Sequence, residues 1–507
     1  MTLMRQIYFA LITLFSLLTL GACRPEPTVI YGMRVPEYVD CAFDAKDVQF
    51  EYILHSAVDA SAVKVSATAD AAWITSINTS TKGMVSFTVD VNDAAKSRTA
   101  TITLKATSHQ AETIEITQYG TPPTTTNHTL MFFFNGVTLD RYFKGNIADT
   151  QKAIENGAIG DSNRVIYFRQ KSKTSAYINE LCYDPTTGRC VERKVVENIP
   201  ISSSQMTAAD LAEYIGMMAS AAPANRYGIV MAGHGQGWIT REVLNGNGGV
   251  SAFSATSNIW APAIGAEVTR AYGESNVQLD IIEIAEGISS SNIEFDYILF
   301  DCCFMSNIEA IYDLRNSANY IIASPCEIMG KGFPYERTLP YLFKNNGNET
   351  DYAGAAESYY KYYRDEYYGS ARCGSIAVTK CSEVDNLRDA AKRLMETGTN
   401  KYLRDDMQTY EGQTHHLFFD ISEWCDVAGQ DDTAKAEFHA QLEKTVIAKH
   451  SLDSFYSAYG TYGTYPINLD IYSGVTTSAP SSVHLRKWKE SNWYKDVWPT
   501  EANEVDE

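Results

Sequence analysis

The sequence has few of the features that mark metal-binding, membrane-spanning or fibrous proteins. Its ten cysteines include no CxxC pair of the kind found in zinc sites. The HExxH and GxSxG motifs are also absent, which excludes the zincin and serine-hydrolase classes. No internal repeat or coiled-coil heptad is evident, and after the first 22 residues no segment is long and apolar enough to span a bilayer.

Positive charge is scarce as well. The 507 residues contain 42 Lys and Arg against 62 Asp and Glu, a net charge of −20, and removal of Arg5 with residues 1–22 makes it −21. An acidic surface repels phosphate backbones, so nucleic acid is excluded as a partner, whereas cationic peptides are attracted. With 45% hydrophobic and 21% charged residues the composition is globular, and the length predicts more than one domain.

The N-terminus predicts export. Arg5 precedes an apolar stretch, Ile7–Leu20, that is shorter than the ~20 residues of a membrane-spanning helix, so residues 1–22 are interpreted as a cleaved signal peptide. The closing Leu-Gly-Ala-Cys sequence resembles a bacterial lipobox, which implies cleavage before Cys23 and lipid attachment to its thiol. We therefore expect a cell-envelope protein, anchored to the membrane by lipid and facing the periplasm or the exterior. The alternative is a plain secretory signal with an incidental cysteine.

Composition shifts divide the mature chain. We predict a tether over residues 23–39, a small β-sandwich over 40–120, a Pro- and Thr-rich linker over 121–128 and a larger α/β domain over 129–507. The β-sandwich follows from period-two alternation of apolar and polar residues between Asn-, Asp- and Ser-rich turns.

Four short sequences in the small domain carry a resemblance: Trp73–Ile74, Val89–Asn92, Arg98–Ile102 and Thr117–Gly120. Together they are similar to the BACON domain, an immunoglobulin-like module of exported bacterial proteins. The resemblance implies either a glycan-binding module or a spacer. We favour the spacer, because Trp73 occupies the place of a core aromatic.

In the larger domain, apolar strands alternate with helical segments. This alternation predicts a mostly parallel sheet with helices on both faces. The strands include residues 130–134 and 164–169, and the helices lie near 207–221, 280–288, 304–316, 351–368 and 382–396. Residues 239–278, rich in Gly, Ser and Asn, predict a long surface loop.

Two of the predicted strands deliver reactive side chains as they end. The apolar run after Arg226 leads to His234, and the run after Phe295 leads to Cys302 and Cys303. The C-terminal edge of a parallel sheet is where chemistry sits, and a thiol needs a neighbouring base to become a nucleophile. The pattern favours a cysteine peptidase, although two unreactive core residues beside a Gly-rich turn stay possible.

The two cysteines differ in direction. Side chains alternate along a strand, so Asp301 and Cys303 should share one face while Cys302 points to the other. We expect Cys302 to be a small buried hydrophobic residue.

Three ordered motifs, at 233–238, 300–305 and 322–335, resemble the clostripain family, relatives of caspases and gingipains, and the likeness covers residues 129–498. The resemblance implies that His234 is the general base, Cys303 the nucleophile, and the N–H groups of Gly235 and Cys303 the oxyanion donors. Cys302 stands where the family usually has Ala.

The resemblance also assigns a specificity pocket. It implies that Asp301 helps to bind the side chain before the scissile bond, and a buried carboxylate there would select Arg or Lys. Asp301 could instead only orient loop amides, and Glu327 could reinforce either role. No cofactor or metal is predicted; calcium is suggested by resemblance only, without EF-hand spacing.

The expected function is a lipid-anchored cysteine endopeptidase acting on peptides or proteins, possibly basic ones. A catalytically inactive peptide- or glycan-binding surface lipoprotein is the alternative, disfavoured because both members of the dyad are present.

Two further expectations concern the chain itself. Family members are cut between the His and Cys motifs, and Arg241 and Arg270 are candidate sites, of which Arg241 is preferred for its place seven residues after His234. Cys182 and Cys190 flank a predicted hairpin turn and could pair across it.

Overall fold

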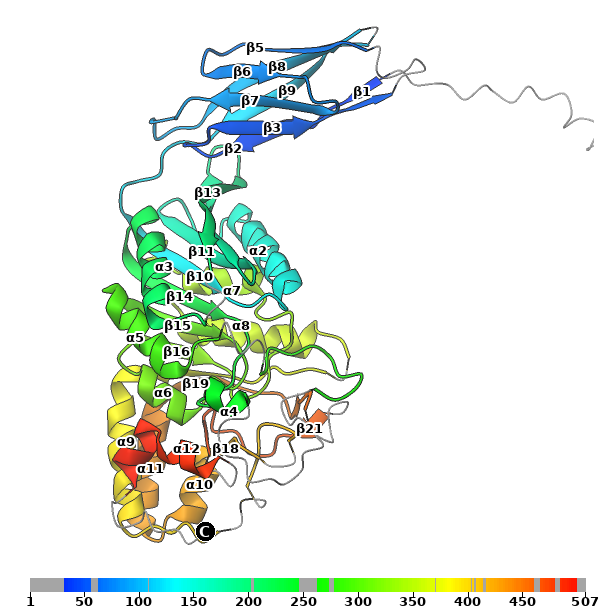
Figure 1. Cartoon of the computed structure of the whole chain (residues 1–507). Coiled ribbons are helices and arrows are strands. Elements are labelled where there is room, and N and C mark those ends of the chain that lie inside the picture. The colour runs from blue at the N-terminus through cyan, green and yellow to red at the C-terminus, as the bar shows by residue number, and fades with distance from the viewer. Residues whose placement is uncertain are drawn as a thin grey trace, which may run out of the picture. The chain divides into compact units, whose positions relative to one another are not determined.

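The computed structural model forms two compact units, Met1–Thr121 and Pro122–Glu507 (Figure 1). None of the described helices is both long and apolar enough to cross a membrane. Cys23 lies outside the described residues, which are 32–55, 63–107, 109–201, 205–245, 262–272, 278–369, 371–402, 404, 407–413, 416–459, 466–478 and 484–498.

The first unit is all β, as predicted, but the strand Gly32–Arg34 and the start of the strand Tyr38–Cys41 lie within residues 23–39, which the sequence predicted as a tether. Its strands pair in the orders β2-β9-β8-β5, β3-β7-β6 and β1-β4. Residues of β7 alternate between half-buried and buried, because Val85, Phe87 and Val89 point into one apolar core. The strands are β1 Gly32–Arg34, β2 Tyr38–Cys41, β3 Asp47–Glu51, β4 Ile53–His55, β5 Val65–Ala69, β6 Ile74–Asn78, β7 Met84–Val89, β8 Arg98–Ala106 and β9 Glu112–Gln118.

Trp73 is half-buried at the edge of this core, and the Arg98 guanidinium lies 4.5 Å from the centre of its ring. The contact covers one face of the indole with a cation. The BACON resemblance and a glycan-binding role stay predictions.

The second unit is built on one large sheet. Among the described residues nine strands pair in the order β13-β12-β11-β10-β14-β15-β16-β17-β19. The five central strands β11, β10, β14, β15 and β16 are parallel to one another, and the pairings outside them are antiparallel. The predicted α/β class is confirmed. The strands are β10 Thr126–Phe134, β11 Asn163–Ser172, β12 Ser175–Asp184, β13 Arg189–Pro200, β14 Ala224–Ala232, β15 Phe295–Asp301, β16 Ala318–Ala323, β17 Ile376–Lys380 and β19 Val446–His450.

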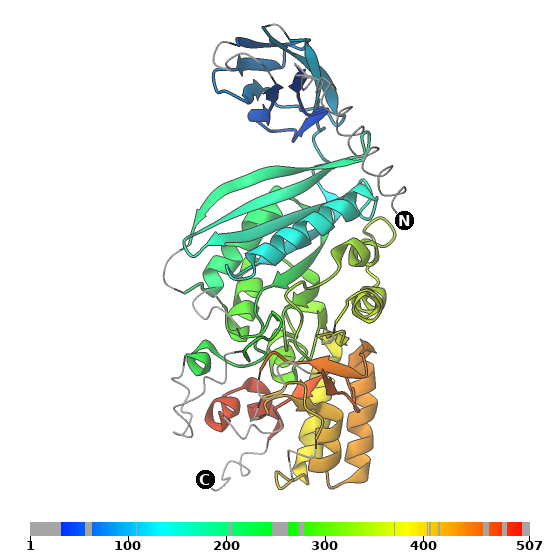
Figure 2. The same cartoon turned by 90° about the vertical axis from the view of Figure 1, so that its right-hand side faces the viewer.

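Helices cover both faces of the sheet (Figures 1 and 2). In Figure 1, α3, α5 and α6 lie along one side, and α2 and α8 along the other. The helices are α2 Asp140–Glu155, α3 Ala208–Ala221, α4 Arg241–Leu244, α5 Ile281–Ser291, α6 Ile308–Leu314, α7 Tyr335–Leu342, α8 Tyr352–Asp365, η1 Cys381–Glu383, α9 Val384–Glu396, α10 Ile421–Ala428, α11 Asp432–Thr445, α12 Leu485–Lys489 and α13 Asn492–Val497. Short pairs β18 Phe419–Asp420 with β22 Thr476–Thr477, and β20 Ser454–Tyr456 with β21 Pro466–Asn468, complete the unit.

The hairpin β12–β13 corrects one prediction. Both Cys182 and Cys190 are free thiols. Cys182 pairs with Val191, and Cys190 pairs with Tyr183. Because this register is regular, the two thiols project from opposite faces of the hairpin, and a disulfide between them does not form.

Candidate active site

The two catalytic motifs meet because β14 and β15 end at the same level of the sheet. Ala232, the last residue of β14, pairs with Asp301, the last residue of β15. His234 and Cys303 each follow two residues later. Both strands end in buried apolar runs at the centre of the sheet. Packing of these runs fixes the positions of His234 and Cys303, which follow them.

The chain turns sharply after β15. Phe304 has a φ of 61°, a left-handed conformation that is costly for a residue with a side chain. Two contacts stabilise the turn: the Phe304 N–H donates to the Cys326 carbonyl at 3.1 Å, and its ring stacks on Phe418 with centroids 4.8 Å apart.

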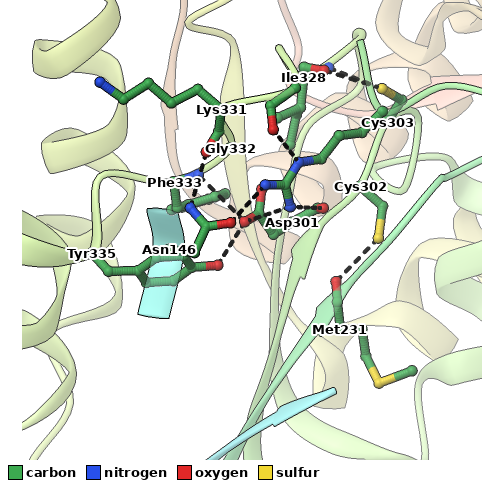
Figure 3. A network of polar contacts seen from close by, with 12 residues as sticks. Asn146, Met231, Asp301, Cys302, Cys303, Ile328, Lys331, Gly332, Phe333 and Tyr335 are labelled. Atoms are coloured by element: carbon green, nitrogen blue, oxygen red, sulfur yellow. Dashed lines mark hydrogen bonds and ion pairs between the residues drawn. The ribbon is translucent and has the colours of Figure 1, made fainter. Parts of the chain in front are cut away.

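The two thiols point in different directions at this turn (Figure 3). Cys303 Sγ accepts a hydrogen bond from the Ile328 N–H at 3.0 Å. Cys302 Sγ donates to the Met231 carbonyl at 3.0 Å and is buried against β14. Cys302 also lines a cavity of about 50 Å³ together with His234 and Gly235.

A segment of the chain itself, residues 268–272, crosses the site next to Cys303. It runs antiparallel to residues 328–330: the Arg270 N–H donates to the Ile328 carbonyl at 2.8 Å, and the Gly330 N–H donates to the Val268 carbonyl at 2.6 Å. We call residues 268–272 the occluding segment. It binds as an added strand, the way an extended peptide is bound at an exposed backbone edge.

The carbonyl group of Arg270 is held by the two predicted oxyanion donors. The Gly235 N–H lies 2.8 Å from this oxygen and the Cys303 N–H 3.4 Å from it. Residue 235 must be a glycine, because a Cβ there would lie 2.1 Å from the Cys303 carbonyl oxygen. These two hydrogen bonds therefore place the peptide bond between Arg270 and Ala271 next to both the His and the Cys motif in space.

The side chain of Arg270 fills a closed pocket. Its guanidinium and the Asp301 carboxylate are both 0% exposed and lie 2.8 Å apart, Nη1 to Oδ2. Nε donates to the Gly330 carbonyl at 3.1 Å, and Nη2 donates to Asn146 Oδ1 at 2.8 Å. Tyr335 completes the pocket by donating its hydroxyl to Asp301 Oδ2 at 2.6 Å (Figure 3).

One wall of this pocket is Gly332, which has a φ of 72°. A Cβ at this position would lie 2.3 Å from Arg270 Nη2 and 2.6 Å from Asp301 Oδ1. Only glycine adopts this backbone easily and leaves room for a guanidinium.

His234 is half-buried beside the occluding segment. Its Nε2 lies 2.9 Å from Thr138 Oγ1, and its Nδ1 is shielded from solvent without a hydrogen-bond partner among the described residues. Burial, followed by the charge of Arg270, lowers the pKa of His234 to about 4, and the backbone of Ala271 opposes this shift. The imidazole is therefore neutral at pH 7 and able to accept a proton.

The thiol of Cys303 is neutral as well. Burial, followed by the charge of Glu327, raises its pKa well above the usual value of a cysteine. A thiol in this environment is a weak nucleophile until the site opens or a base removes its proton.

Of the residues that the sequence singled out, the structure joins Gly235, Cys303, Arg270 and Asp301 by direct contacts. It also places His234 with Gly235 and Cys302 around one cavity. Sequence reasoning missed four others that contact this group. Asn146, Gly332 and Tyr335 line the pocket, and Thr138 contacts His234. Gly332 and Tyr335 stand in the third motif, whereas Asn146 and Thr138 stand in no pattern that signals their role.

The preference for Arg241 as a processing site is wrong. Arg241 is 7% exposed, its Nη2 donates to Glu283 at 2.6 Å, and its Nη1 donates to the Gln278 carbonyl at 2.7 Å. These contacts hold α4 against the start of α5.

The chain is similar in sequence and fold to known cysteine proteases. The family model Peptidase_C11, described as the clostripain family, matches residues 174–462. A secreted C11 cysteine protease from Bacteroides thetaiotaomicron, iotapain, is 30% identical with a TM-score of 0.64, over 74% of this chain and 100% of its own. An inactive zymogen of a C11 protease from Parabacteroides distasonis is 25% identical with a TM-score of 0.60, over 75% and 100%. A search of curated proteins found no match.

A second secreted C11 cysteine protease from Bacteroides thetaiotaomicron was solved in complex with an irreversible peptide inhibitor. It is 22% identical with a TM-score of 0.59, over 73% of this chain and 98% of its own. At this identity the likeness shows a shared fold.

The buried ion pair predicts a large effect on stability. In a Cys303→Ala chain, which should stay uncut, Asp301→Asn leaves the Arg270 charge buried without its partner. We expect the free energy of unfolding to fall by about 3–5 kcal/mol. Chemical denaturation of the two chains measures the difference. A further Arg270→Met substitution should recover most of the loss, and a change below about 1 kcal/mol would mean that the pair does not form.

Proposed function

The chain belongs to the clostripain family of cysteine peptidases, as the sequence predicted, and we propose that it is an exported endopeptidase that cleaves after arginine. In this proposal Cys303 is the nucleophile and His234 the general base. The observation that carries it is the pose of Arg270, whose carbonyl oxygen accepts from Gly235 and Cys303 while its side chain pairs with Asp301.

The reaction follows from these contacts. His234 takes the proton of the Cys303 thiol, and the sulfur attacks the carbonyl carbon of the residue before the scissile bond. The oxygen gains negative charge, which the N–H groups of Gly235 and Cys303 stabilise. His234 then gives its proton to the leaving amide nitrogen, the carbon–nitrogen bond breaks, and water later hydrolyses the thioester.

Arginine fits the pocket better than lysine. The guanidinium donates in three directions, to Asp301, Asn146 and the Gly330 carbonyl. An ammonium group is a compact point charge and does not reproduce the planar fork. A lysine would leave at least one buried acceptor without a donor, which costs about 1–3 kcal/mol.

The first substrate in this proposal is the enzyme itself, at the bond between Arg270 and Ala271. Attack within one chain profits from a very high effective concentration. The Parabacteroides distasonis relative was solved as an inactive zymogen, which supports an uncut form that is not yet active.

Export and anchoring form a second part of the proposal. The signal-like residues 1–22 and the lipobox-like ending at Cys23 support lipid attachment, and a relative is described as secreted.

Exchange of each thiol tests the assignment of the nucleophile. We expect Cys303→Ala to abolish self-cleavage and peptide hydrolysis. Cys302→Ala should keep most of both activities, because its thiol contacts the Met231 carbonyl and not the Arg270 carbonyl. Initial rates with an arginyl reporter peptide measure the difference. Because Cys302 shares a cavity with His234, this variant is the matched control, and the reverse result would make Cys302 the nucleophile.

Substitution of the two arginines tests the processing site. Arg270→Ala should prevent cleavage between the motifs, whereas Arg241→Ala should still be cut, provided that it folds. Arg270→Lys should be cut about 10–100-fold more slowly, by the loss of one hydrogen bond to a buried acceptor. Gel analysis with mass determination of the fragments gives the cut and its rate. Fragments of the Cys303→Ala chain would indicate a contaminating protease instead.

Fractionation of cells tests the anchor. Wild-type protein is expected with the membranes, and Cys23→Ser protein in the soluble fraction, because stable attachment needs the acyl chains. Membrane association of the Cys23→Ser protein would contradict lipid attachment at this residue.

A further inference from the structure

We propose that Glu327 is a specificity-determining residue that selects threonine or serine at the position before the scissile arginine. The inference rests on the proposed function, because it takes the occluding segment as a bound substrate. In that segment Thr269 occupies the position before Arg270.

The contact between the two side chains is direct and closed from solvent. Thr269 Oγ1 donates to Glu327 Oε2 at 2.6 Å. Glu327 is 0% exposed and Thr269 is 6% exposed. The backbone of Thr269 pairs with Met329 in an antiparallel bridge, so its side chain is held at a defined depth beside the third motif. A peptide bound in the same register would present its own side chain to the same carboxylate.

The other partners of Glu327 leave one position for a substrate. Oε1 accepts from the Ser457 hydroxyl and from the Ala458 N–H at 3.0 Å, and Oε2 accepts from the same N–H at 3.1 Å. Without Thr269, Oε2 keeps only this shared backbone donor. No ion pair with an Arg or Lys is recorded for Glu327 among the described residues. A buried carboxylate oxygen left in this way needs a donor from the substrate.

A hydroxyl suits this position better than an ammonium group. Burial raises the pKa of Glu327 to about 7, with Ser457 and Thr269 opposing the shift and Glu411 adding to it. Near neutral pH the group is therefore present in both forms. A hydroxyl donates to a carboxylate and accepts from a carboxylic acid, whereas an ammonium group only donates. Threonine and serine satisfy both forms of Glu327.

Valine is the sharpest comparison, since it has the shape of threonine without the hydroxyl. A valine in this position leaves Oε2 short of one donor, at a cost of about 1–3 kcal/mol, which corresponds to about 10–100-fold in kcat/KM. Specificity built on a buried polar group in this way rejects the analogue that lacks its partner.

The experiment uses wild-type protein after self-cleavage and reporter peptides with the sequence Glu-Val-Thr-Arg of residues 267–270. Threonine is replaced by serine, valine, alanine or lysine, and kcat/KM is measured for each peptide. We expect threonine and serine to be cleaved at least about 10-fold faster than valine and alanine. In Glu327→Met the ratio of threonine to valine should fall to about one, whereas Glu327→Gln, which can still hydrogen-bond, should keep part of it.

Other results overturn the proposal. Equal rates for threonine and valine in the wild type would do so without any variant, which matters if Glu327→Met does not fold. A preference for lysine would indicate a cation site instead, and an unchanged ratio in Glu327→Met would assign the preference to other residues. Failure of the proposed function looks different: no peptide is cleaved and Cys303 is not labelled by an arginyl inhibitor, which removes both proposals together.

Discussion

The buried pair of Arg270 and Asp301 is the interaction on which the arrangement of the site depends. Two charges that are 0% exposed are costly to bury, and hydrogen bonds to their remaining donors and acceptors offset part of that cost. Here Asn146, Tyr335 and the Gly330 carbonyl supply such partners, whereas Asp301 Oδ1 has none among the described residues. The pair fixes the side chain of Arg270. This also fixes the register in which the backbone of the occluding segment pairs with residues 328–330. The carbonyl group of Arg270 is thereby brought to the amides of Gly235 and Cys303.

In the proposed function, the same contacts keep the uncut chain in a state of low activity. With the segment in place, the charge of Arg270 adds to burial in lowering the pKa of His234, and burial raises the pKa of Cys303. Both catalytic groups are then neutral, and the cleft is filled by the chain. Departure of the segment removes the arginine charge from His234 and admits water to the thiol. Both changes favour the thiolate–imidazolium pair that the chemistry uses.

Much of this fold and part of the site could be predicted from the sequence. The buried runs that end before His234 and Cys303 are too apolar to lie anywhere but in central strands, and their shared edge follows from parallel pairing. The pocket could not be predicted in full, because Asn146 lies on α2, 124 residues from Arg270, and depends on how the helix packs. The preference for Arg241 was wrong for a related reason. Closeness to His234 along the chain did not bring the Arg241 carbonyl to the amides of Gly235 and Cys303, since the Arg241 side chain is held by Gln278 and Glu283.

In the proposed function, the occluding segment therefore describes the substrate that the site accepts. Two of its side chains end on groups that a different residue would leave unsatisfied: the guanidinium of Arg270 on three acceptors, and the hydroxyl of Thr269 on Glu327. Beyond Arg270, the Ala271 carbonyl accepts from the Tyr459 hydroxyl at 2.9 Å, and the ring of Tyr272 stacks on Phe304 at 5.3 Å. Glycine at positions 235 and 332 lets the backbone and the guanidinium approach this closely. A buried polar group rejects a substrate that lacks the matching hydrogen-bond partner, because the group is then left unsatisfied. The contacts that recognise the occluding segment are therefore the same contacts that would select other protein substrates.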